Sequence, residues 1–449
     1  MTRRGMTLVE MMVAVTATLI LMGAVAQVFS IFGTAVTNSR SMLELDSQLR
    51  VVSNRLRNDL KGVTAQTLPP LSPDSAEGYF EIVEGPWRES DVAADAAVAR
   101  TDADDVLLFT TRSTAAPFVG NCSLGGSNGT FESPVAEVAW FARQTVDPSN
   151  RLPITFTLYR RQLIVVGYAG VSPFNDGENS NTPASWPDTW PSYYLSCDVS
   201  ARLVSGKLRP NTLADLTKPE NRFMHRANNL ITGAGAAFPY LFVPHMQPSV
   251  NATVDVMDTS TYGGILPGLI FDGTSTRAGE DVVLTNVLSF DVRVFDPGAP
   301  VAASVSGSTA LVAGDAGFSN VPISSGGYVD LGNTVTLNTL LAASGTSAYF
   351  AGPVGGSLAL GTGTRFIYDT WSTHYESDGV DQDDPADGID EGSNGIDDDD
   401  DGRIDEPDEQ ESQPPYPRPL RGIEVRIRCW EPTSRQVRQV TVRHTFVPH

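Results

Sequence analysis

The strongest feature of the hydrophobic pattern is a predominantly apolar run over residues 8–32, close to the amino end of the chain. A helix rises about 1.5 Å per residue, so a run of this length spans a bilayer whose hydrocarbon core is roughly 30 Å thick. Arg3 and Arg4 stand before the run with no acidic residue beside them. This positive charge predicts that the amino end stays in the cytoplasm and that the rest of the chain is exported.

The helical pattern continues beyond the apolar run, because the segment 33–61 contains no proline and only one glycine, Gly33. Apolar residues recur in steps of four and three, which places them on one helical face: Leu45, Leu49, Val52, Leu56 and Leu60. Charged residues fill much of the remaining circumference: Arg40, Glu44, Asp46, Arg50, Arg55, Arg57 and Asp59. Gly62 indicates the end of the helix. The pattern predicts one helix of roughly 55 residues, apolar all round over 6–32 and amphipathic over 33–62.

The remainder of the chain, 63–449, consists of short apolar segments divided by Gly, Pro, Asn and Asp, a texture typical of an antiparallel β domain. Six segments have strand or hairpin character: 106–110, 135–141, 154–159, 163–166, 283–295 and 420–446. Residues 167–280 are interpreted as a loop-bearing insertion, and 298–363 as irregular surface. Together the elements predict an α+β fold in which the amphipathic half of the helix packs on the protein's own antiparallel sheet, with large loop insertions.

The segment 283–295 shows the clearest alternation of apolar and polar positions. Leu288, Phe290, Val292 and Val294 alternate with Ser289, Asp291 and Arg293. Successive side chains of a strand point to opposite faces, so the pattern predicts a strand with one buried face.

Glu10 is the one ionisable side chain within 8–32, and an ionisable group inside hydrocarbon is a functional hypothesis by default. The sequence Gly5-Met6-Thr7-Leu8-Val9-Glu10 resembles the type IV prepilin leader, with a short basic segment, a glycine at the cut and glutamate at mature position five. The resemblance implies that a prepilin peptidase removes residues 1–5 by cutting between Gly5 and Met6, and that the new Met6 amine is methylated. It also implies that Glu10 pairs with the amino terminus of a neighbouring subunit. Opposite charges in a low dielectric offset each other's desolvation.

Two other interpretations of the amino end compete with this one. Ala24-Val25-Ala26, before Gln27, fits the small-x-small cleavage site of an ordinary secretory signal peptide, and Arg3-Arg4 resembles a twin-arginine signal. The acidic residue and the length of the apolar run favour the prepilin interpretation.

An aromatic pair of strand segments, 137–141 and 156–161, flanks the turn-rich segment 147–151 and predicts a hairpin. In this position after a long helix, the pair is similar to the J-type minor pseudopilins of type II secretion and to the large minor pilins of type IV pili. The closing hairpin, 420–446, also resembles the J-type family. The resemblance implies a pilin-like fold and a place in the tip complex of a pseudopilus. Its partners would be other minor and major pseudopilins, and its location the inner membrane and then the periplasmic pseudopilus.

Two alternatives stay open beside the pseudopilin interpretation. The same subunit fits a type IV surface pilus, and the chain also fits a signal-anchored calcium-binding surface adhesin outside any filament. An enzyme is the least favoured class, because the five histidines are scattered without metal spacing. Residues 125–129 match the nucleophile-elbow pattern only formally, since no apolar strand precedes them and no helix follows. We therefore expect no catalytic activity.

The formal net charge of −22 is concentrated in the segment 376–411, which holds 18 acidic residues and one basic residue. This balance disfavours nucleic acid as a partner and favours a cation. Part of the segment fits the template of a calcium-binding loop, with Gly402 at the turn and six candidate ligands: Asp397, Asp399, Asp401, Arg403 (through its carbonyl), Asp405 and Asp408. Asp408 replaces the usual glutamate. Similar Asp-Gly phrases upstream resemble tandem calcium repeats, so we expect Ca²⁺; the alternative is a solvated acidic loop.

The chain has three cysteines, and their spacing is not typical of a metal site. In an exported protein two of them can form a disulfide, and Cys122–Cys197 is the favoured pair because both lie in loop-like sequence. Cys429 falls in a strand pattern and is expected to be a buried free thiol. Sequence alone does not fix the pairing.

Overall fold

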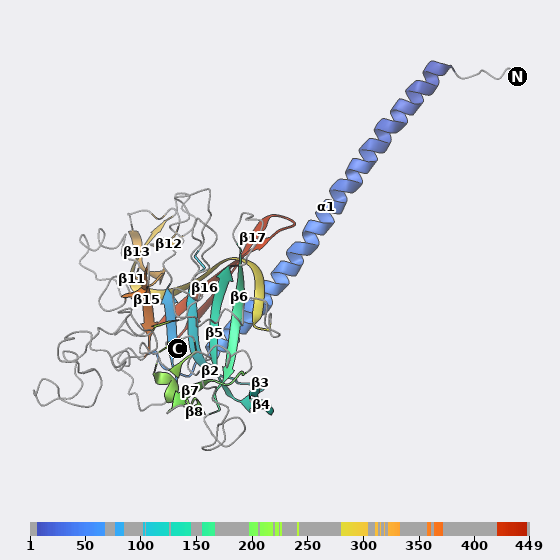
Figure 1. The fold of residues 1–449 in the computed structure, drawn as a ribbon. Coiled ribbons are helices and arrows are strands. Elements are labelled where there is room, and N and C mark those ends of the chain that lie inside the picture. Colours follow the sequence, from blue (N-terminus) through green and yellow to red (C-terminus); the bar gives the residue numbers. More distant parts are fainter. Residues whose placement is uncertain are drawn as a thin grey trace, which may run out of the picture.

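The structure is a computed structural model that describes residues 7–67, 77–84, 102–103, 105–124, 127–144, 155–166, 197–204, 207–218, 221–223, 225–226, 240–241, 280–303, 310–312, 315, 318, 322–332, 357–360, 363–370 and 420–446. A single long helix stands against a large antiparallel sheet, as the sequence predicts (Figure 1).

Helix α1 runs from Leu8 to Lys61 and has 54 residues. Thr7 caps its amino end, and Glu10 completes a capping box with it. At the other end, Gly62 follows the last turn, and its N–H donates to the carbonyls of the two residues before Lys61. A Cβ on Gly62 would lie 2.1 Å from the carbonyl oxygen of Arg112, so this close approach of helix and sheet requires glycine.

The two halves of α1 have different environments. The apolar half extends away from the body of the protein (Figure 1), and its large side chains are exposed, with Leu8 at 76% and Phe29 at 73%. The second half packs on the sheet through the predicted stripe, all five members of which are buried: Leu45, Leu49, Val52, Leu56 and Leu60. The predicted division of the helix into an apolar and an amphipathic half is confirmed.

Among the described residues the main sheet has 11 strands, and each of their pairings is antiparallel. Its order is β14-β15-β1-β2-β5-β6-β11-β16-β17, and β12 and β13 pair with β11. The strands are β1 (Phe80–Glu84), β2 (Val106–Arg112), β5 (Val135–Gln144), β6 (Phe156–Ile164), β11 (Val282–Ala303), β12 (Ala310–Val312), β13 (Pro322–Val329), β14 (Ser357–Leu360), β15 (Gly363–Asp369), β16 (Gly422–Glu431) and β17 (Gln436–Thr445).

Both predicted hairpins are confirmed. Strand β6 pairs with β5 over nine positions, from Ala136 opposite Ile164 to Gln144 opposite Phe156, and it joins the two predicted segments 154–159 and 163–166 into one strand. Strands β16 and β17 pair along their whole length. Side chains alternate across β5, so Trp140 joins the core beneath the helix whereas Phe141 joins a second core on the opposite face of the sheet.

The insertions carry more regular structure than expected. Strand β11 continues to Ala303, and β12, β13 and β14 lie within 298–363, so the expectation of irregular surface there is wrong for these strands. The smaller elements are β3 (Phe118–Leu124), β4 (Ser127–Ser133), β7 (Ala201–Val204), β8 (Lys207–Pro210), the 3-10 helix η3 (Asp215–Thr217), β9 (His225–Arg226) and β10 (Tyr240–Leu241).

The predicted face of β11, with Leu288, Phe290, Val292 and Val294, is buried, but the opposite face is buried as well. Ser289, Asp291 and Arg293 are as fully buried as the apolar residues between them. A buried charged side chain is tolerated when it is paired, and Arg293 pairs with Asp291 on the same strand and with Asp315 and Asp330, which come later in the chain.

Candidate functional site

The amino end of α1 is the first candidate site. The Glu10 Oε2 atom accepts hydrogen bonds from the Thr7 N–H at 2.9 Å and from the Thr7 hydroxyl at 3.0 Å. The Thr7 hydroxyl in turn accepts from the Glu10 N–H at 3.3 Å. The carboxylate therefore satisfies the first turn of the helix and stands at its positive end. Gly5 and Met6, where cleavage and methylation are predicted, lie outside the described residues.

Helix α1 is the one candidate for a membrane span in the part of the chain that the structure describes. Its most apolar stretch is entirely unburied within the protein. So large a continuous apolar surface marks a contact with lipid or with other chains rather than with water. The helix fits a membrane anchor of the kind that type IV pilins have.

A buried ion pair fixes the other end of α1 to the sheet. Arg160 on β6 donates from Nε to Asp59 Oδ2 and from Nη2 to Asp59 Oδ1, both at 2.7 Å. Trp140 on β5 donates its indole N–H to the same Oδ2 at 3.0 Å. The two charged side chains are only 3% and 6% exposed. Three donors from two strands thus hold one helical carboxylate.

In the sequence, Asp59 is grouped with the charged residues expected on the solvent-facing side of the helix. This expectation is wrong for Asp59, which is buried. Asp59 lies one turn from Leu56 and beside Leu60, so it borders the buried stripe. The two consecutive arginines at the end of the predicted segment 156–161 have separate partners. Arg160 points to the helix, whereas Arg161, on the opposite face, pairs with Asp198 at 2.9 Å and Asp281 at 3.0 Å.

The structure joins Cys122 and Cys197 in a disulfide. Cys122 lies in strand β3, so the expectation that both cysteines lie in loops is wrong for Cys122. The backbones of Cys122 and Cys197 also pair in an isolated antiparallel β-bridge, and Cys197 precedes β7. The neighbouring Asp198 carboxylate accepts from the Asn121 N–H at 2.9 Å. Cys429, on β16, is buried, and burial raises its pKa to about 12.

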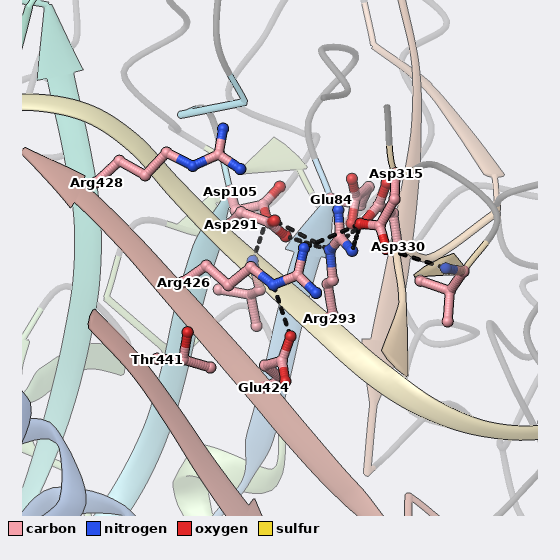
Figure 2. Close-up of polar contacts among 12 residues, drawn as sticks. Glu84, Asp105, Asp291, Arg293, Asp315, Asp330, Glu424, Arg426, Arg428 and Thr441 are labelled. Carbon is pink, nitrogen blue, oxygen red and sulfur yellow. Dashed lines mark hydrogen bonds and ion pairs between the residues drawn. The ribbon is translucent and has the colours of Figure 1, made fainter. Parts of the chain in front are cut away.

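A second buried charge cluster lies where β11, β13 and β16 meet (Figure 2). Arg293 Nη1 donates to Asp315 Oδ1 at 2.6 Å, and its Nε lies 3.0 Å from Asp291 Oδ2 and 3.1 Å from Asp330 Oδ1. Arg426 reaches the same Asp315 oxygen at 3.0 Å. Burial alone would lower the pKa of Arg293, but Asp291 and Asp330 outweigh it and raise that pKa well above its usual range.

More carboxylates adjoin this cluster at the end of β1 and just before β2. Glu84, Asp102 and Asp105 each offer an oxygen within 4.8 Å of the others, and Asp102, Asp291 and Asp330 form a second such group. All five residues are buried. Burial, and next the carboxylate of Asp105, raise the pKa of Asp102 well above its usual range.

Sequence reasoning missed these carboxylates because they come from segments far apart in the chain. The signal that was available is Asp-Ala-Asp-Asp at 102–105, directly before the apolar run 106–109, and the acidic residue Asp291 among the apolar positions of 283–295. The predicted calcium ligands Asp397, Asp399, Asp401, Arg403, Asp405 and Asp408 lie outside the described residues.

A family model described as the prokaryotic N-terminal methylation motif matches residues 1–26. The match includes Gly5, Met6, Glu10 and most of the apolar run, and it supports a type IV pilin-like protein of the prepilin type. Such a motif implies processing by a prepilin peptidase and assembly with other pilins. No curated protein and no solved structure matches the chain.

Proposed function

We propose that this chain is a minor pilin-like structural subunit of a type II secretion pseudopilus, that it lies in the tip complex, and that it supports protein export without catalysing a reaction. The observation that carries the proposal is the first half of α1, a projecting apolar helix that bears one carboxylate at its capped end. A helix of this kind meets lipid before assembly and other helices after it.

The sheet body supports a place at the tip. Strand β11 alone has 22 residues and pairs with four other strands, so the body is bulky and carries its own buried charge clusters. A repeating shaft packs identical bodies against one another, whereas a tip subunit has free space on one side. The partners in this proposal are other minor and major pseudopilins, which contact it through α1.

The location that follows is the inner membrane, with the amino end cytoplasmic, and then the periplasmic pseudopilus. The −22 charge of the chain disfavours nucleic acid as a partner. The calcium site at 397–408 also remains part of the proposal, because weak oxygen-ligand sites suffice at extracellular calcium concentrations.

Glu10 is proposed to exchange its Thr7 hydrogen bonds for the methylated Met6 amine of a neighbouring subunit. Replacement by alanine removes both the charge and the capping box, whereas Glu10→Gln keeps a side chain that completes the box and removes only the charge. We expect both variants to accumulate as folded, cleaved protein and to be absent from sheared or cross-linked filaments. Normal incorporation of Glu10→Gln would rule out charge pairing.

A deletion strain separates the pseudopilus from the alternatives. Loss of secreted enzymes with surface fibres intact supports the pseudopilus, and loss of fibres with secretion intact supports a minor pilin of a surface pilus. An adhesin outside any filament predicts that neither changes and that Glu10→Ala is harmless.

A further inference from the structure

Asp102 is the most unusual charged residue in the described part of the chain. It is 2% exposed, and neither of its carboxylate oxygens accepts a hydrogen bond from the residues that the structure describes. Its backbone is nevertheless fixed, because its carbonyl accepts from the Phe290 N–H on β11 at 3.0 Å. Burying a carboxylate without a compensating partner costs several kcal/mol, and a cation bound beside Asp102 would offset this cost.

Two further carboxylates converge on the same point. One ligand oxygen from each of Glu84, Asp102 and Asp105 lies within 4.8 Å of the other two. Calcium–oxygen bonds are about 2.3–2.6 Å long, so oxygens on one calcium ion lie at most about 5 Å apart. The separation therefore fits three carboxylates around one ion.

Backbone hydrogen bonds orient two of the three carboxylates. The Val292 N–H on β11 donates to Asp105 Oδ2 at 2.6 Å, and the Leu331 N–H, two residues after β13, donates to Glu84 Oε2 at 3.2 Å. Such outer partners hold ligand carboxylates in place in metal sites. The supporting N–H groups thus come from β11 and from the segment just after β13, whereas the carboxylates come from β1 and the segment before β2.

Asp102 also belongs to the second group, with Asp291 and Asp330, but that group contains a protein cation. The Arg293 guanidinium lies 3.0 Å from Asp291 and 3.1 Å from Asp330 (Figure 2). Its charge offsets those two carboxylates and favours the first group, Glu84, Asp102 and Asp105, as the place for an ion.

We propose that Glu84, Asp102 and Asp105 bind one calcium ion, which ties the end of β1 and the start of β2 to β11. The ligands are all carboxylate oxygens, which favours a hard cation, and no histidine or cysteine belongs to either carboxylate group, which disfavours zinc. Calcium accepts irregular oxygen sites with more than six ligands, whereas magnesium demands near-octahedral geometry and keeps its waters. None of these three residues belongs to the acidic segment 376–411 of the sequence.

The test uses the full-length protein in detergent micelles, stripped with EDTA and titrated with calcium chloride. The parent for the titration carries Asp397→Asn, Asp399→Asn and Asp401→Asn, so that the acidic segment contributes as little as possible. Three variants of this parent each carry one more substitution: Asp102→Asn, Asp105→Asn or Asp46→Asn. Asp46→Asn is the matched control, because it removes one half-exposed helical carboxylate outside the cluster. Asp105→Asn keeps an oxygen that accepts from Val292. Equilibrium dialysis with radioactive calcium and the melting temperature are the readouts.

We expect the parent and Asp46→Asn to bind one calcium ion per chain and to gain about 2–4 °C in Tm at saturating calcium. Asp102→Asn and Asp105→Asn should lose that ion, or bind it at least tenfold more weakly, and lose the gain in Tm. The difference in melting temperature between Asp102→Asn and the parent, both free of calcium, is a second readout. With the ion removed, like charges repel, so Asp102→Asn should melt above its stripped parent.

Three results would overturn the proposal. An unchanged calcium count in Asp102→Asn would exclude Asp102 as a ligand. A parent that neither binds calcium nor gains stability from it would mean that protons alone neutralise the cluster. Equal stabilisation by magnesium would overturn the choice of calcium.

Discussion

The ion pair between Asp59 and Arg160 should be the main fixed point between α1 and the sheet. In Asp59→Ala, the Arg160 guanidinium stays buried and loses two 2.7 Å hydrogen bonds, and the Trp140 N–H loses its acceptor. Breaking a buried pair by removing one partner costs about 3–5 kcal/mol, because the other charge is left uncompensated. We expect a loss of this size in the free energy of unfolding.

A control lies on the same helix. Asp46 is 3.7 Å from Arg438, and both side chains are about half exposed. An exposed pair contributes roughly 0–1 kcal/mol, so Asp46→Ala should differ from Asp59→Ala by several kcal/mol. Guanidinium unfolding of the full-length chain in detergent micelles, followed by tryptophan fluorescence, measures both.

Removing both charges should be milder than removing one. Asp59→Leu combined with Arg160→Met replaces the buried pair by apolar side chains, a change that is often close to neutral. The double variant should therefore be more stable than Asp59→Ala. Equal losses of unfolding free energy in Asp59→Ala and Asp46→Ala, or a loss below about 1 kcal/mol in Asp59→Ala, would show that the Asp59–Arg160 pair does not fix the helix to the sheet.

Three smaller predictions follow from other contacts. Burial opposes the charged form of Glu431, but hydrogen bonds from Ser434 outweigh this effect and lower the pKa of Glu431 from 4.5 to about 2. The free energy of unfolding should therefore fall as the pH drops from 4.5 toward 2, and Glu431→Gln should abolish this dependence in melting curves measured at different pH values. Arg222→Met leaves buried Glu81 without its 2.9 Å partner, and calorimetry should show a loss of about 3–5 kcal/mol. Reducing the Cys122–Cys197 disulfide should lower the free energy of unfolding by about 2–5 kcal/mol, measured with denaturant. Reduction should cause the same loss in a Cys429→Ser variant, because Cys429 is not part of the disulfide.

Much of the fold follows from periodicity in the sequence. The stripe from Leu45 to Leu60 steps along one helical face, and apolar or aromatic segments on either side of a turn mark β5, β6, β16 and β17, so these elements are predictable from local patterns. Patterns of this kind depend on which residues are apolar. They report burial against a core, and they carry no information about which strands become neighbours.

The buried charges could not be predicted in the same way. Asp59 has the composition of a solvent-facing helical residue until Arg160, about a hundred positions later in the chain, is placed against it. Asp291 and Arg293 likewise indicate an exposed strand face until Asp315 and Asp330, later in the chain, are placed against Arg293. Partners distant in sequence decide whether such a charge is solvated or paired.

The amino end is a different case, because its signal is a motif rather than a periodicity. Gly5, Met6 and Glu10 could be proposed from the sequence, and the match of residues 1–26 to the methylation motif supports the same class of protein. The structure adds the capping role of Glu10 in the isolated subunit.

The mass of the mature amino-terminal peptide, measured on protein purified from membranes, would decide whether this chain is a processed prepilin. We expect a peptide that begins at Met6 and carries one additional methyl group on its amine. A peptide that begins at Gln27 would contradict this expectation, since an ordinary signal peptide would then have been removed together with Glu10 and the apolar half of α1.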